Sequence, residues 1–214
     1  MHLSFKLASR CLFGNPFKLS RAFLNFMFKI KRHRRNYYLL VFANSIAAIF
    51  GGLSLPFFLV FFFEFGGNAS VLATAIAIQG VFTAVASYYA GKLSDRVGRK
   101  PLLIASSIAS GFVVMLYAFI QQLWHLYVLQ ALVGLITAVY AVVEQVYLAD
   151  ITKKISRGAD IGRYAMIIGV LYSAFTIVGG FFVGIVTFKI AFLLLGAIFM
   201  IDTIPLFFLT EKRA

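Results

Sequence analysis

The most informative shortages in this sequence are those of charge and of reactive side chains. Only 7 of the 214 residues are acidic, and charged residues make up 13%, against about 25% in an ordinary soluble protein. Cys11 is the single cysteine and the three histidines are scattered, so we expect no internal disulfide and no metal centre. There is no glycine-rich nucleotide loop and no nucleophile set beside its base. We therefore expect neither an enzyme nor a bound cofactor.

Apolar residues fill the sequence instead. They make up 62% of it, and the mean hydropathy is +0.93, whereas soluble domains hold roughly 45–50% apolar residues. A bilayer core about 30 Å thick is crossed by roughly 20 apolar residues of helix. Six runs are long enough: 37–63, 70–90, 101–121, 124–147, 164–187 and 190–209. The sequence predicts an all-α, polytopic membrane protein of six transmembrane helices.

The positions of the basic residues predict the orientation. A net charge of +13 would suit a nucleic-acid partner in a soluble fold. Here, however, 19 of the 20 Lys and Arg residues lie before Tyr37, in gaps 91–100 and 148–163, or in the C-terminal tail, and only Lys189 lies in an alternate gap. Basic residues collect on the cytoplasmic side of membrane proteins. We expect both termini in the cytosol, a multi-pass protein of the cell membrane, and no nucleic-acid partner.

The chain divides into three parts on this basis. Residues 37–209 form the membrane bundle, and residues 210–214 form a cytoplasmic tail. Residues 1–36 contain no acidic residue and mix Phe and Leu with Lys and Arg. They fit an interfacial amphipathic helix on anionic lipid, an organelle-targeting extension, or a start that really lies at Met27. A disordered segment is the remaining expectation for this part.

The gap after the second run carries the most specific motif, Gly-Lys-Leu-Ser-Asp-Arg-Val-Gly-Arg-Lys-Pro at residues 91–101. It closely resembles the signature loop between helices 2 and 3 of the major facilitator superfamily. Residues 126–134, and residues 147–152 followed by Arg157 and Gly158, resemble the fourth helix and the helix 4–5 loop of that family. The resemblance covers about residues 37–209. It implies the N-terminal six-helix half of such a transporter, built as a 3+3 helix repeat.

In that family the loop is thought to hold the two halves together in the outward-facing state. The resemblance implies the same conformational role for Gly91, Asp95, Arg96, Gly98, Arg99 and Asp150. Glycines permit tight turns and close helix approach, and Arg96 can pair with a carboxylate on a neighbouring helix, for which we expect Asp150. The alternative is a basic loop that only sets membrane topology.

Polar residues inside the spans predict a solute path. On the fourth run Gln130, Gly134, Thr137, Ala141 and Glu144 follow helical spacing, which predicts one stripe facing the bundle interior or a cavity. Asn44 and Gln79 extend this set, although helix–helix hydrogen bonding explains each residue equally well. Gln130 stands where many proton-coupled members have Arg, which argues against proton coupling. Asp202 is an intramembrane carboxyl without an obvious partner.

These features predict one half of a carrier that moves a small solute by alternating access, because a solute binds between two six-helix halves of such a carrier. A second copy or a separate polypeptide would supply the other half, and the lipid bilayer surrounds both. The rival hypothesis is a non-transporting membrane protein: a scaffold, a regulatory partner or a remnant.

Overall fold

The computed structural model describes residues 32–66 and 68–210, and within them six helices are long and apolar enough to cross a membrane. They are α3 (Arg32–Gly66), α4 (Ala69–Val97), α5 (Arg99–Leu116), α6 (Leu123–Ile151), α7 (Arg157–Phe182) and α8 (Phe188–Ile201). A 3-10 turn, η1 (Tyr117–Phe119), continues α5, and α9 (Thr203–Phe207) continues α8. The predicted fold class and number of spans are confirmed. The interpretations offered for the N-terminal segment fall almost wholly outside the described residues.

The helices do not end where the hydrophobic runs end. The fourth helix continues to Ile151, and α7 begins at Arg157 rather than at residue 164. Helix α7 stops at Phe182, before the predicted end at 187, because Gly184 in the following turn has a φ of 89°. Hydropathy marks the part of a helix that lies in lipid, whereas capping and backbone conformation set its ends.

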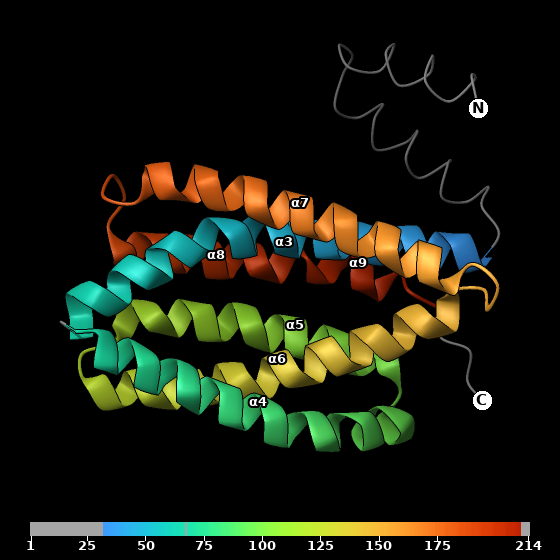
Figure 1. Ribbon diagram of the computed structural model, residues 1–214, viewed down its shortest axis with the longest axis horizontal. Coiled ribbons are helices and arrows are strands. Elements are labelled where there is room, and N and C mark those ends of the chain that lie inside the picture. The colour runs from blue at the N-terminus through green and yellow to red at the C-terminus, as the bar shows by residue number, and fades with distance from the viewer. Residues whose placement is uncertain (1–31, 67, 211–214) are drawn as a thin grey trace, which may run out of the picture.

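The six spans pack as an antiparallel bundle in which both described ends of the chain lie together (Figure 1). The amide of Asn36 near the start of α3 donates a hydrogen bond to the carbonyl oxygen of Thr210 over 2.7 Å. We call this the basic end; it also carries the α4–α5 turn and the α6–α7 connection. Of the described basic residues, Lys189 lies at the opposite end.

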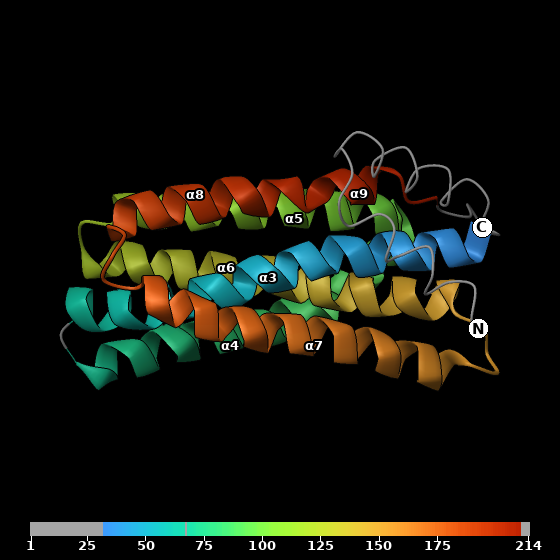
Figure 2. The same cartoon turned by 90° about the horizontal axis from the view of Figure 1, so that it is seen from above.

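Helix contacts follow the expected 3+3 repeat. Helix α3 packs along α7, α6 packs along α4, and α5 packs against α8 (Figures 1 and 2). In such a repeat, α3, α4 and α5 correspond to α6, α7 and α8. The α3–α7 contact then corresponds to the α6–α4 contact, and the α5–α8 contact corresponds to itself. The contact pattern therefore has the pseudo-twofold relation of two three-helix repeats.

Each of these three contacts contains a glycine at a close backbone approach. A Cβ added to Gly52 of α3 would lie 2.3 Å from a backbone oxygen of α7. One added to Gly134 of α6 would lie 2.5 Å from a backbone oxygen of α4, and one added to Gly111 of α5 would lie 2.8 Å from a backbone oxygen of α8. Helices in lipid associate through small residues of this kind, because no hydrophobic force drives them together there.

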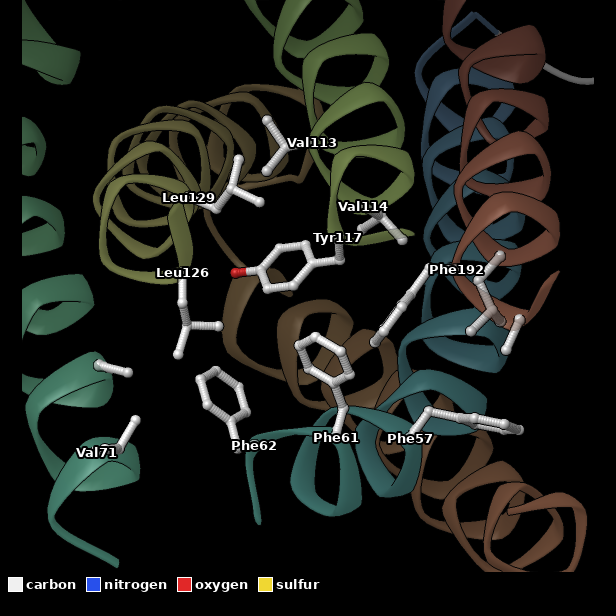
Figure 3. Packing of buried hydrophobic residues seen from close by; sticks show 13 residues of the cluster. Phe57, Phe61, Phe62, Val71, Val113, Val114, Tyr117, Leu126, Leu129 and Phe192 are labelled. Atoms are coloured by element: carbon white, nitrogen blue, oxygen red, sulfur yellow. The ribbon is translucent and has the colours of Figure 1, made fainter. Parts of the chain in front are cut away.

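Two apolar clusters lie toward the two ends of the bundle. The one near the opposite end is aromatic, and Figure 3 shows Tyr117 and Phe192 facing Phe61 inside it. Their rings stand at centroid distances of 5.2–6.4 Å, which suits favourable aromatic contact. The cluster near the basic end is mainly aliphatic and includes Leu40 and Leu103.

Several buried side chains between the two clusters, or beside them, are polar. We call this set the polar layer; it consists of Asn44 and Ser54 on α3, Ser106 and Ser107 on α5, Gln130 on α6, and Asp202 and Thr203 at the α8–α9 junction. Helix α5, for example, contributes Leu103 to one cluster and Val113 to the other, with both serines between them.

Candidate functional site

The signature loop, residues 91–101, reverses the chain through a single residue. Gly98 separates α4 from α5 with φ 97° and ψ 158°, and its backbone N–H donates to the Ser94 carbonyl over 3.0 Å. A residue with a Cβ is strongly disfavoured in this conformation. Ser94 is buried, and its hydroxyl donates to the Gly91 carbonyl over 2.8 Å. The last turn of α4 and the reversal therefore form one hydrogen-bonded unit.

Arg99, the first residue of α5, joins the ends of three helices. Its Nε lies 2.8 Å from Oδ2 of Asp150 near the end of α6, and a terminal nitrogen lies 3.8 Å from Oδ1 of Asp95 on α4. The expectation that Arg96 would pair with Asp150 is thus corrected. Arg99 stands one residue past the reversal and so points back across α4, whereas Arg96 is exposed on the last turn of α4.

The two lysines at the edges of the loop have different roles. Lys100 donates from Nζ to the carbonyl oxygen of Phe207 over 2.6 Å, which satisfies an otherwise open carbonyl at the end of α9. Lys92 stays on its own helix, with Nζ 3.0 Å from the Tyr88 hydroxyl and 4.4 Å from the centre of that ring. The loop is therefore fixed to α4, α5, α6 and α9 from within the chain.

One face of the loop meets nothing in the described part of the chain. A Cβ added at Gly91 would have no atom within 4 Å, so no described helix makes the close approach expected there. The side chain of Asp95 is 72% exposed, and Arg96 is exposed beside it. Glycine, carboxylate and guanidinium together form an open surface, which we call the open face of α4.

Two polar contacts connect α6 to its neighbours in the half of the bundle nearer the basic end. The hydroxyl of Tyr140 donates to Oδ1 of Asn44 over 2.8 Å, and the amide of Asn44 donates to the Leu40 carbonyl over 3.2 Å. One turn further along α6, Glu144 accepts a hydrogen bond from the hydroxyl of Tyr164 on α7. Asn44 and Glu144 are thus held by tyrosines that sequence reasoning missed, although Tyr140 precedes Glu144 by one helical turn.

The remaining predicted path residues do not share one environment. Gln130 is buried, and its Oε1 has no hydrogen-bond donor among the described residues. Gln79 is half-buried on α4, and its carbonyl oxygen faces Gly134 at their close crossing. Thr137 is exposed. The predicted single stripe on α6 is therefore split, because α4 covers Gly134 and leaves Thr137 uncovered.

Asp202 does have a partner, from a helix far away in the sequence. Ser107 of α5 donates its hydroxyl to the Asp202 carboxylate, and the hydroxyl of Thr203 lies 2.9 Å from that of Ser107. Helix α8 breaks at Asp202 because Pro205 cannot donate to the carbonyl of residue 201 and its ring crowds that carbonyl. Within the described part of the chain, no group of three His, Cys, Asp or Glu side chains could hold a metal ion.

Six apolar spans, a polar layer between two apolar clusters, and a charged reversal after the second span define the class: a multi-pass membrane protein built like half of a secondary transporter. The family model described as Major Facilitator Superfamily matches residues 40–214. The chain belongs to the major facilitator superfamily, and this family of membrane transporters is the resemblance inferred from the loop.

Individual relatives match over shorter stretches. "Multidrug resistance protein MdtG" of Proteus mirabilis is 32% identical over 108 residues, 48% of this chain and 27% of the relative. "Uncharacterized MFS-type transporter YqjV" of Bacillus subtilis is 31% identical over 134 residues, 59% of this chain and 33% of the relative. "Tetracycline resistance protein, class B" of Escherichia coli is 31% identical over 133 residues, which are 61% of this chain and 33% of the relative. The matched part spans about a third or less of these relatives.

Proposed function

We propose that this chain forms one half of an alternating-access carrier for a small, largely apolar solute in the cell membrane, with both termini in the cytosol. The observation that carries the proposal is the signature loop, which is fixed from within by Arg99 yet leaves the open face of α4 uncovered. A loop that served only to set topology would need basic residues but no open glycine beside a carboxylate. An opposing helix would use all three groups.

Burial along the spans supports a second half. In the most apolar window of each span, α5 and α8 have 39% and 44% of their residues buried, whereas α4 and α7 have only 17% and 6%. On the uncovered side of α7, Gly162, Gly169 and Gly180 recur at helical spacing, and an added Cβ at each would meet nothing. Small residues on an open helix face suit close packing against another helix in lipid. We propose that a second copy or a separate six-helix chain packs there.

The polar layer supports the solute path. Leaving a buried acceptor without a donor costs about 1–3 kcal/mol, and Gln130 has such an oxygen among the described residues. A solute with a hydrogen-bond donor would recover this cost. The relatives named for resistance to multiple drugs and to tetracycline are consistent with a drug-like solute that leaves the cell.

Transport is tested with the purified chain in proteoliposomes. The probes are tetracycline and ethidium, applied with and without an imposed ion gradient. Uptake above that of protein-free vesicles is expected from the chain, either alone or with a six-span protein that purifies with it. If neither preparation moves either probe above background, while the chain is folded and inserted, the transport proposal fails and the non-transporting alternative takes its place.

The loop is tested by comparing two exposed carboxylates. Asp95→Asn removes the charge from the open face of α4, whereas Glu64→Gln removes an exposed charge at the opposite end of the bundle. We expect Asp95→Asn to lower the transport rate at least tenfold with unchanged helicity, and Glu64→Gln to leave the rate within twofold. Equal transport rates for the two variants would refute the proposed conformational role of the loop.

A further inference from the structure

A cavity of about 400 Å³ opens at the basic end, between the start of α3 and the connection from α6 to α7. It is separate from the signature loop and from the polar layer. The basic residues Arg34, Lys153 and Arg163 line it, and Asp160 is the one acidic residue in its lining. Three cations against one carboxylate give the cavity an excess of positive charge.

Asp160 does not neutralise the whole set, because its own loop and helix hold it. Its Oδ2 accepts from the Ser156 hydroxyl over 2.9 Å, and its Oδ1 lies 3.8 Å from Arg163. The hydroxyl of Tyr37 donates to its backbone carbonyl over 2.9 Å, which ties α7 to α3 at the cavity wall. Within the described residues, no carboxylate lies within salt-bridge distance of Arg34 or Lys153. Among the described residues, two cations in the wall therefore have no fixed counter-charge.

The cavity lies at the ends of membrane spans, the part of such a protein that meets lipid headgroups. The spans of α3 and α7 begin at Arg34 and Arg157, and the span of α6 ends at Ile151, so the lining residues sit at the ends of three spans. Tyr37 and Tyr38 line the cavity, and tyrosine favours the membrane–water interface. Beside Lys153 and Lys154, the side chain of Ile155 is fully exposed. An exposed isoleucine among lysines is typical of a loop that inserts its apolar side chain into the membrane–water interface.

From this geometry we infer that the cavity binds the phosphate headgroup of an anionic phospholipid. A phosphodiester carries one negative charge and several acceptor oxygens, which match the unpaired guanidinium and ammonium donors. Basic cavities between spans at the membrane surface recognise such headgroups, and about 400 Å³ lies within the size range of small-ligand sites.

The chain offers a matched pair of lysines for the test. Lys153 lines the cavity, whereas Lys154, the next residue, is also exposed but does not line it. The purified chain in a non-ionic detergent is titrated with phosphatidylglycerol or phosphatidylcholine, and bound lipid is counted by native mass spectrometry. We expect phosphatidylglycerol to bind first and more tightly. Lys153→Gln and Arg34→Gln should each weaken it about fivefold, as expected for one interfacial charge, while Lys154→Gln stays within twofold.

Two outcomes overturn the inference. Equal affinity for the two lipids would show that the cavity does not recognise an anionic headgroup. Equal losses of affinity in Lys153→Gln and Lys154→Gln would show that general surface charge, and not the cavity, attracts the lipid. Adding millimolar inorganic phosphate distinguishes the source: if it displaces the lipid fully, the cavity is a site for soluble phosphate instead. The result of this measurement depends neither on a transport substrate nor on the orientation of the protein in a membrane. Failure of the proposed carrier function and failure of this site are therefore observed separately, and circular dichroism verifies that each variant is folded.

Discussion

The close crossing of α4 and α6 makes Gly134 sensitive to a single added methyl group. In Gly134→Ala the new Cβ would lie 2.5 Å from the carbonyl oxygen of Gln79, 3.1 Å from Cβ of Phe82 and 3.2 Å from the backbone nitrogen of Thr83. Ordinary contact begins at 3.4 Å, so the two helices must separate by roughly 0.9 Å. The closest atom is backbone, which cannot move aside as a flexible side chain would.

Overpacking of this kind costs about 1–3 kcal/mol. The separation would also lengthen the hydrogen bond from the Thr83 hydroxyl to the Gly134 carbonyl, now 3.2 Å, which adds up to about 1 kcal/mol. Together these predict a loss of about 1–4 kcal/mol in the free energy of unfolding. The measurement is the unfolding midpoint in mixed micelles of a non-ionic detergent and sodium dodecyl sulfate, followed by circular dichroism.

Gly80, on α4 itself, provides the matched control, because an added Cβ there would meet nothing within 4 Å. Gly80→Ala makes the same chemical change on a helix of the same pair without the clash. It should leave the midpoint unchanged or raise it slightly, since alanine is the better helix former. Equal midpoints for the two variants would refute the claim that glycine sets the distance between α4 and α6.

Three further predictions concern the loop and the polar layer. Gly98→Ala forces a Cβ into the left-handed region at φ 97° and should cost about 1–3 kcal/mol, measured as a lower unfolding midpoint. Arg99→Gln removes contacts to two helices, each a partly exposed ion pair worth at most about 1 kcal/mol. The rate of amide hydrogen exchange at the end of α6 should therefore rise up to about fivefold. Arg96→Gln should leave that rate unchanged. Ser107→Ala takes a donor from buried Asp202 and should lower stability by about 1–3 kcal/mol; adding Asp202→Asn should restore part of that loss if the hydroxyl acts through the carboxylate.

Hydropathy and the distribution of basic residues predict the number of spans because lipid imposes a strong, one-dimensional rule on a sequence. The signature loop was recognisable for a similar reason, since its meaning lies in residues that follow one another. Gly98 at the reversal is a local requirement of one backbone angle. Features of this kind are legible in a sequence because no distant residue is needed to produce them.

Contacts between distant helices could not be predicted in the same way. The sequence alone does not distinguish Arg96 from Arg99 as the partner of Asp150, because the choice depends on the direction in which α5 leaves the reversal. Ser107 and Asp202 are joined only because α5 packs along α8. Helical spacing placed Thr137 with Gln130 and Glu144, but it could not show that α4 covers only part of that side of α6.

The positions of the glycines explain why the bundle remains incomplete on one side. Where glycine lies at a close crossing, as at Gly52, Gly111 and Gly134, a backbone oxygen of a neighbouring helix fills the space. At Gly91 and Gly169, no described residue fills the space, and each lies on a helix with little buried surface. Glycine costs a helix about 1 kcal/mol relative to alanine. Within the described residues, the first set recovers that cost through packing and the second does not. The cost at the second set is recovered if another helix lies against α4 and α7, which is where the proposed second half would pack.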